Sequence, residues 1–360
     1  MSKPRPTLRS LAAEAGVSPM TVSLALRNSR EVSAATRQRL QRLAAARGYR
    51  PDPTIAKLMQ HLRARAPTRF QASIGGLTQG WSGLELGPNN YLSRLARGLR
   101  ARAAALGYAF SLFDMDEHPK PAQLQRVLVS RGIEGLVLLP LRQPCDLTKR
   151  LEWDAFATVS VTPSVAAPQF HGVMPHHFDN MLRACDELTR AGCRRIGLAI
   201  TKEWDERVNR RWTGGIAWQN QFGGTSAVVP LIGSHPGLNL DLAAFSRWLQ
   251  REKPDAVICE TLDQVALGAV FNQLPATRRP LVVTLNWPGM AADVGIDQRV
   301  ERIGEVAIDV LAGMITRGEK GVPVLPNTTL VDGAWVKRAG TPRKSSFLAI
   351  KRHRSKRSSS

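Results

Sequence analysis

The sequence predicts two kinds of fold in one chain, an all-α N-terminal domain and a larger α/β domain. Within the first 50 residues, apolar positions recur at helical spacing. Beyond about residue 70, short apolar strands alternate with amphipathic helices, which is typical of doubly wound parallel sheets. The candidate strands are too many for one open sheet, so we expect two α/β lobes with a cleft between them.

Two short helices joined by a tight turn form the centre of the N-terminal domain. Residues 8–15 carry apolar side chains on one face, and Gly16 stands where a helix needs a left-handed terminating residue. Ser18 and Pro19 restart the chain as an N-cap followed by a proline at the first helical position. The spacing therefore predicts a helix-turn-helix unit.

The second helix, from Pro19 to about Leu26, is predicted to present its first turns to the outside. Its spacing places towards the interior three side chains, those of Val22, Ala25 and Leu26. The side chains that it places towards the outside are those of Pro19, Met20, Thr21, Ser23 and Leu24. A helix of this size fits the DNA major groove. Helix pairs of this kind also occur as plain packing units, so both interpretations stay open on this pattern alone.

A third helix follows, and with it the similarity to a known family becomes specific. Ser33 caps it, Gly48 ends it, and residues 49–53 break the helical pattern before a short hinge segment. Residues 7–53 resemble the N-terminal domain of the lactose-repressor (LacI/GalR) family of bacterial transcription regulators. The shared features are Ala-Gly-Val-Ser, Thr-Val-Ser, Val-Ser-x-x-Thr-Arg and Gly-Tyr-x-Pro.

Positive charge is concentrated at the two ends of the chain. Residues 1–69 hold 14 Lys and Arg against three Asp and Glu, and residues 341–360 hold seven basic residues and no acidic one. Of the formal net charge of +21, only +3 belongs to residues 70–340. Such concentration is the electrostatic footprint of a phosphate-binding surface. No basic helix has the apolar face that binding to a membrane surface needs.

The resemblance assigns contacts with double-stranded DNA to a definite set of side chains. Its base-reading positions fall on Pro19, Met20 and Leu24, which are apolar and suit thymine methyl groups. Hydroxyl and backbone-holding positions fall on Thr7, Ser18, Thr21, Ser23, Arg27, Asn28 and Arg30. In the hinge, Leu58 takes the place of a leucine wedge that opens a base step in the minor groove. A homodimer on a pseudo-palindromic operator is implied.

The resemblance extends, more loosely, over about residues 5–337 and implies a type I periplasmic-binding-protein-like effector domain. Two subdomains of that fold clamp a small molecule, usually a sugar or nucleobase-type ligand, and dimerise. The effector-binding positions fall on Trp81, His176, Arg211, Asp263 and Asn286. Trp204 and Trp287 are further candidates for stacking on a ring. Where the family carries acidic residues this chain has others, so three alternatives stay open: a ligand less hydroxylated than a hexose, an anionic ligand, or binding through other residues.

These observations define the expected domains. They are a DNA-binding domain over residues 1–53, a hinge and linker over 54–69, an effector and dimerisation domain over 70–340, and a basic, disordered tail over 341–360. We expect an allosteric repressor controlled by a sugar-like metabolite. The alternative is a sugar-binding protein without a transcriptional role, which would need a signal peptide and no helix-turn-helix.

Several classes of protein are disfavoured by the sequence. No catalytic or nucleotide-binding motif is present, so we expect neither an enzyme nor a cofactor. His176-His177 and the acidic run over residues 114–118 lack the spacing of metal sites. The four cysteines have no Cys-x-x-Cys spacing. No apolar stretch reaches membrane-spanning length, and we expect a cytoplasmic, nucleoid-associated protein.

Overall fold

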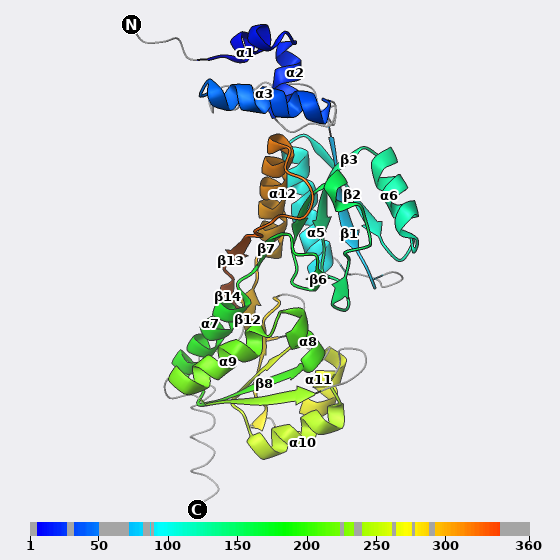
Figure 1. The fold of residues 1–360 in the computed structure, drawn as a ribbon. Coiled ribbons are helices and arrows are strands. Elements are labelled where there is room, and N and C mark those ends of the chain that lie inside the picture. The colour runs from blue at the N-terminus through cyan, green and yellow to red at the C-terminus, as the bar shows by residue number, and fades with distance from the viewer. Residues whose placement is uncertain are drawn as a thin grey trace, which may run out of the picture.

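The computed structural model describes residues 6–26, 32–49, 72–81, 87, 90–223, 227–233, 240–260, 264–275, 278–287 and 292–338. Within them the chain forms a helical N-terminal domain and two α/β lobes (Figure 1). Among the described helices, none combines the length and apolar character that a bilayer crossing requires.

The N-terminal domain packs three helices around a small apolar core. They are α1 (Leu8–Ala15), α2 (Pro19–Leu26) and α3 (Ala34–Ala46). Gly16 ends α1 with a φ of 66°, which confirms the predicted left-handed cap. Ser33 caps α3 by accepting a hydrogen bond from the Thr36 N–H. The buried side chains of the core are Leu11, Ala12, Val22, Ala25, Val32, Leu40 and Ala44.

The N-terminal lobe is a fully parallel six-stranded sheet with the order β13-β7-β5-β3-β1-β2. Its strands are β1 (Ala72–Thr78), β2 (Tyr108–Asp114), β3 (Ile133–Leu138), β5 (Ala157–Ser160), β7 (His171–Pro175) and β13 (Thr328–Val331). Its helices are α5 (Tyr91–Ala105), α6 (Pro121–Ser130) and α12 (Val300–Arg317). A short pair, β4 (Cys145–Asp146) with β6 (Val165–Ala167), and the 3-10 turn Trp153–Ala155 complete it.

The C-terminal lobe repeats this design with the order β14-β12-β11-β10-β8-β9. Its parallel strands are β8 (Arg195–Thr201), β9 (Ala227–Gly233), β10 (Ala256–Cys259), β11 (Leu281–Thr284) and β12 (Val294–Asp297), and β14 (Ala334–Lys337) is antiparallel. Its helices are α7 (His177–Arg190), α8 (Lys202–Arg207), α9 (Arg211–Phe222), α10 (Leu242–Glu252) and α11 (Gln264–Phe271).

The chain crosses between the two lobes after β7, after β12 and after β13 (Figure 1). Hydrogen bonds tie the crossings after β7 and after β13 to each other. The His176 N–H donates to the Val331 carbonyl over 3.0 Å, and the Gly333 N–H donates to Asn180 Oδ1 over 2.9 Å. These two connections therefore form one hinge region, which brings the carboxyl ends of strands from both sheets towards a shared cleft.

Helices α5 and α12 pack more closely than ordinary side chains would allow. A Cβ atom on Gly98 would overlap the Glu301 carbonyl oxygen, and one on Gly304 would lie 2.8 Å from the Leu95 carbonyl oxygen. Glycine at both positions lets the two backbones meet. This contact fixes the N-terminal end of α12, and with it the crossing that leads into α12 from β12.

The alternation of strands and helices confirms the predicted two-lobed α/β class. The sequence predicts strands at 73–77, 109–113, 135–139, 157–161, 171–174, 195–200, 227–230, 256–259 and 281–285. All nine are present, with ends that differ by at most three residues. The pattern of the sequence also predicts a helix over residues 208–221, but this helix begins at Arg211, because Asn209 and Arg210 adopt left-handed φ values of 54° and 58°. The short strands β12 and β13, which flank crossings between the lobes, were not among the predicted strands.

Candidate DNA-binding helix and ligand cleft

Ser18 holds the first turn of α2. Its Oγ accepts a hydrogen bond from the Thr21 N–H over 3.0 Å and lies 2.9 Å from Thr21 Oγ1. This cap satisfies a backbone donor that the helix leaves open. Met20, in the same turn, is 66 % exposed, while Val22 and Ala25 are fully buried. The helix therefore presents a short outward surface at its N-terminal turn, as its spacing predicts.

Leu24 departs from the expected orientation. The spacing places it outward, but it is half-buried and packs against the apolar core of the N-terminal domain. Thr21 and Ser23 are half-buried as well. Thr7 is exposed, and its Oγ1 accepts a hydrogen bond from Ser10 N–H over 3.1 Å in a capping box. The free surface of α2 is therefore centred on its first turn.

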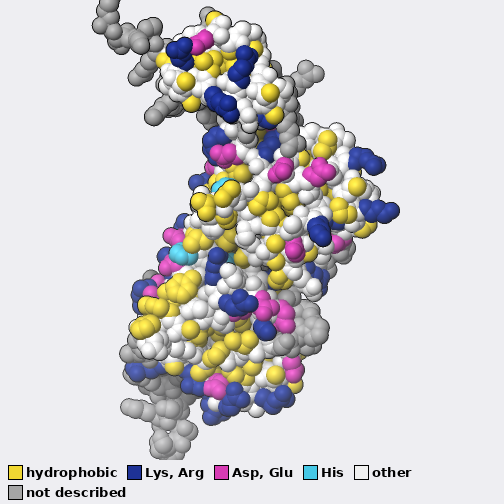
Figure 2. All heavy atoms as spheres, in the orientation of Figure 1, with side chains coloured by type: hydrophobic (Ala, Val, Ile, Leu, Met, Phe, Trp, Pro, Cys, Tyr) yellow, Lys and Arg dark blue, Asp and Glu magenta, His cyan; other side chains and the backbone are white. Residues whose placement is uncertain are grey.

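Side chains of α3 brace the ends of the other two helices. Arg39 Nη2 donates to the Ala15 carbonyl over 3.2 Å, and Gln41 Nε2 donates to the Ala25 carbonyl over 3.1 Å. These carbonyls lie at helix C-termini, where a donor or a positive charge is stabilising. On the visible face of this domain, Lys and Arg side chains outnumber acidic ones (Figure 2). The N-terminal domain therefore holds α2 in a fixed position and surrounds it with a basic surface.

Several residues assigned to DNA contacts lie outside the described residues. They are Arg27, Asn28, Arg30 and Leu58, together with the whole hinge and linker over 54–69. The basic tail over 341–360 also lies outside them. These assignments stay predictions.

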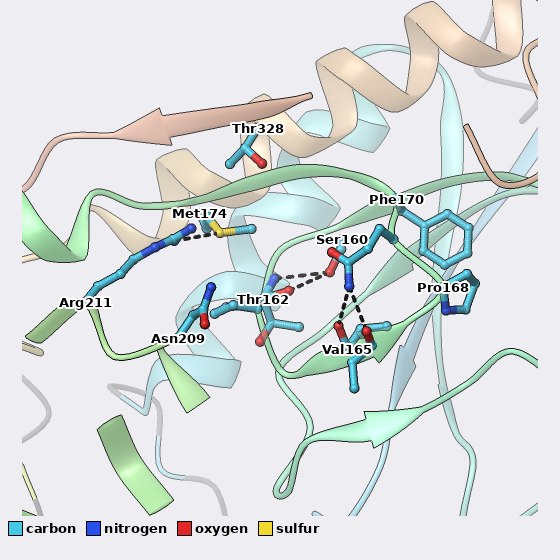
Figure 3. A pocket seen from close by; sticks show the side chains of 12 residues that line it. Ser160, Thr162, Val165, Pro168, Phe170, Met174, Asn209, Arg211 and Thr328 are labelled. Atoms are coloured by element: carbon cyan, nitrogen blue, oxygen red, sulfur yellow. Dashed lines mark hydrogen bonds between the residues drawn. The ribbon is translucent and has the colours of Figure 1, made fainter. Parts of the chain in front are cut away.

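A cavity of about 250 Å³ opens between the two lobes (Figure 3). Most of its wall comes from the N-terminal lobe, and Asn209 and Arg211 enter from the C-terminal lobe. The polar lining side chains are Ser160, Thr162, Gln169, Asn209, Arg211 and Thr328. Hydroxyl, amide and guanidinium groups of this kind can orient a small polar molecule. The volume lies just below the range of about 300–1,000 Å³ that is typical of ligand sites.

The turn before α9 aims Arg211 at this cavity. Asp205 fixes the turn, because its carboxylate accepts hydrogen bonds from Thr213 N–H over 3.2 Å and from Thr213 Oγ1. Arg211 Nη1 reaches across to Met174 Sδ over 3.1 Å (Figure 3). A thioether sulfur is a weak acceptor. Partial burial lowers the pKa of Arg211 below its usual value. The Arg211 guanidinium can therefore exchange this weak hydrogen bond for one to a stronger acceptor.

A second arginine, Arg207, is buried where the two lobes meet. It is 7 % exposed, and within the described part of the chain its Nε and Nη1 have no hydrogen-bond partner. Its guanidinium carbon lies 4.4 Å from the ring centre of Trp204 and 5.6 Å from that of Trp81, in the other lobe. Burial lowers the pKa of Arg207 to about 10. Our sequence analysis missed this residue, although Trp204 and Arg207 have the i, i+3 spacing of helix neighbours.

Comparison with known proteins agrees with the geometry of the N-terminal domain. Residues 7–52 match the model of the family described as "Bacterial regulatory proteins, lacI family". The HTH-type transcriptional repressor CytR of Escherichia coli (strain K12) is 26% identical over 273 residues, which cover 73% of this chain and 74% of CytR.

The N-terminal domain, residues 7–52, is a lacI-family regulatory domain.

Solved structures share the fold of this chain. The lac repressor dimer bound to operator and the anti-inducer ONPF aligns with a TM-score of 0.52 at 20% identity, covering 94% of this chain and 99% of the repressor. A complex of the transcriptional regulator CelR with cellobiose aligns with a TM-score of 0.55 at 22% identity, covering 93% of this chain and 100% of CelR. The two-lobed domain with an N-terminal helix-turn-helix is therefore the LacI-type architecture.

The structure places the predicted effector residues in different surroundings. Of the five, Arg211 alone lines the described cavity. Trp81 lies against Arg207, and its Nε1 donates to the Pro140 carbonyl over 2.7 Å. Asp263 lies outside the described residues. Asn286 follows β11, and its N–H donates to Thr284 Oγ1 over 3.0 Å.

His176 lies in the hinge region rather than on the cavity wall. Its Nδ1 is 3.1 Å from Asp332 Oδ1, which belongs to another crossing. With Asp179 these two side chains place ligand atoms within 4.8 Å of one another, a grouping that could hold a metal ion. Asp179 also pairs with Arg183 over 3.3 Å. The neighbouring His177 is buried, which lowers its pKa to about 3 and keeps it neutral.

Proposed function

We propose that this chain is a homodimeric repressor of the LacI family that binds a pseudo-palindromic operator and whose operator affinity is controlled by a small molecule held between its lobes. The supporting observation is that one chain joins a capped, outward-facing α2 to a two-lobed domain whose cavity is lined from both lobes. A ligand that contacts both lobes favours one relative placement of them, which is the differential binding that allostery requires.

The relatives support this proposal. CytR is named a transcriptional repressor, the lac repressor structure is a dimer bound to operator, and the CelR structure contains cellobiose. By analogy, the recognition helices of two copies of this chain would enter successive major grooves. The molecule would then act on nucleoid DNA. The proposal needs no catalytic step, and it contains no cofactor.

A sugar-binding protein without a transcriptional role is the competing proposal. It gives no function to the N-terminal domain, in which Ser18, Arg39 and Gln41 hold α1 and α2 in fixed positions. Selection of bound sequences from a random duplex pool at stated salt separates the two. We expect a pseudo-palindromic consensus. Retention of DNA without any enriched sequence, with and without added sugars and sugar acids, would contradict the repressor proposal.

A further inference from the structure

We propose that the small molecule bound between the lobes is anionic, and that Arg207, between the indoles of Trp81 and Trp204, receives its carboxylate or phosphate group. This inference rests on the proposed function and narrows the class of its ligand.

The first observation is the lining of the cavity. Among the described residues that line it there is one cation, Arg211, and neither Asp nor Glu. Neutral polyols are held by groups that include strong acceptors for their hydroxyl protons, and carboxylates are the strongest of these. A wall that offers a cation and few strong acceptors favours a ligand that supplies the negative charge itself.

The second observation is the burial of Arg207 without a counter-ion. Among the residues that the structure describes, no carboxylate pairs with it, and two of its nitrogen atoms lack a hydrogen-bond partner. Leaving a buried cation unpaired is costly, because the charge loses its hydration without gaining an opposite charge. The side chain of Arg142 does not offset this cost, because it carries the same positive charge as Arg207. Burial also raises the pKa of Tyr91, which keeps that phenol neutral.

The third observation is the geometry of the two indoles. Both rings lie within cation–π range of the guanidinium carbon. Contacts of this kind use the flat faces of a guanidinium, whereas its N–H donors point outward in its plane. The indoles therefore hold the group in place and leave donors for an anion. Charge-assisted hydrogen bonds of arginine to carboxylate or phosphate are among the strongest that proteins form.

Arg207 is not among the residues that line the cavity, but it is a close neighbour in the chain of two that do. Asn209 and Arg211 line the cavity, and Arg207 lies two residues before Asn209 in the same short segment. Because Arg207 belongs to the C-terminal lobe and Trp81 to the other, an anion at Arg207 would bind where the lobes meet. Its binding would therefore favour the arrangement in which they stay together.

Thermal unfolding of the full-length chain tests the site with simple anions. Inorganic phosphate or acetate is compared with chloride at equal ionic strength, for wild type, Arg207→Gln and the control Arg210→Gln. Arg210 is a nearby exposed arginine. We expect phosphate or acetate to raise the wild-type midpoint more than chloride does. This excess should persist in Arg210→Gln and vanish in Arg207→Gln. An equal excess in all three proteins, or none in wild type, overturns the proposal.

Titration calorimetry with matched sugars distinguishes the two anion sources. D-glucuronate carries a carboxylate, glucose 6-phosphate carries a phosphate, and D-glucose carries neither. We expect one of the anionic probes to bind at least tenfold more tightly than glucose, and Arg207→Lys, which keeps the charge but loses the planar fork, to reduce that preference. Tighter binding of glucose overturns the proposal. Operator binding by the ligand-free protein is measured separately, so loss of the anion site leaves the repressor proposal standing.

Discussion

Arg94 Nη2 of one lobe lies 3.0 Å from Asp297 Oδ1 of the other. The same guanidinium donates from Nε to Glu301 over 2.9 Å and from Nη1 to the Trp287 carbonyl. Its side chain is 8% exposed. One arginine on α5 therefore holds the end of β12, the start of α12 and the loop after β11. Movement of the lobes relative to each other must stretch or break the contact between Arg94 and Asp297. A ligand that moves the lobes therefore acts on this contact.

Replacing Glu301 with Gln should lower stability and change its pH dependence. The hydrogen bonds from Arg94 hold the pKa of Glu301 at about 2, against an ordinary value of 4.5. A depressed pKa contributes stability that is present above about pH 4.5 and is lost as pH falls towards 2. Because the Glu301 carboxylate is partly exposed, we expect the free energy of unfolding to fall by only about 1–2 kcal/mol at pH 7.

Urea unfolding at a series of pH values between 7 and 2.5 measures this loss. The matched control is Glu305→Gln on the same helix, whose partner Arg302 is 58% exposed. The control should stay within about 0.5 kcal/mol of wild type at pH 7. Identical acid sensitivity of Glu301→Gln and wild type would show that the Arg94–Glu301 contact does not contribute this stability.

Gly98→Ala should destabilise the protein through the contact between α5 and α12. The added Cβ would overlap the Glu301 carbonyl oxygen, which is backbone and cannot rotate away. We expect a cost of about 1–3 kcal/mol or more. Gly313→Ala on α12 is the control, because its Cβ would meet the movable end of Arg317, and a helical alanine should be neutral or stabilising. Equal thermal midpoints for the two variants would contradict this packing account.

Met20→Ala should weaken operator binding without weakening the fold. The side chain is 66% exposed on the first turn of α2 and contributes little to the core. Loss of an apolar contact with a base edge should reduce specific affinity by about tenfold, or ~1.4 kcal/mol, and leave non-specific binding almost unchanged. Gln38→Ala, exposed on α3, serves as the control in fluorescence anisotropy. Equal losses on specific and random duplexes would show that Met20 does not read sequence.

Glu260→Gln should make the protein less sensitive to alkaline conditions. Burial raises the pKa of Glu260 to about 7, while Glu260 Oε1 accepts a hydrogen bond from Thr284 Oγ1 over 2.9 Å. For an acid, a raised pKa means that stability is greatest below about pH 4.5 and falls as pH rises through 7. Gln keeps the acceptor and cannot ionise. Denaturation midpoints from pH 5 to 8.5 should fall less steeply in the variant, and parallel curves would contradict this.

The sequence predicted the helical domain well because its signals are local. Gly16, Ser18 and Ser33 each mark a helix end by their own backbone or side-chain chemistry, and the structure uses all three in that way. The orientation of Leu24 was less predictable, because the packing of three helices around one core decides which side chains at the edge of the buried face are covered.

The ligand cleft was predictable only where a motif marks it. Arg211 stands in a recognisable arginine-glycine segment and lines the cavity. The burial of Arg207 depends on Trp81, which is more than 100 positions away in the chain and comes from the other lobe. The pairing of His176 with Asp332 likewise depends on two crossings that meet only in the folded chain. Local spacing carries no signal for such contacts.

Ligand control of operator affinity is the central claim, and the affinity for the selected operator measures it most directly. The dissociation constant is determined at fixed salt, with and without a saturating cleft ligand identified by calorimetry, for wild type, Arg211→Gln and Arg210→Gln. We predict a change of at least about fivefold in wild type and in Arg210→Gln. Arg211→Gln should keep the ligand-free affinity and lose the change. An unchanged operator affinity in wild type, with the ligand shown to be bound, would contradict the account.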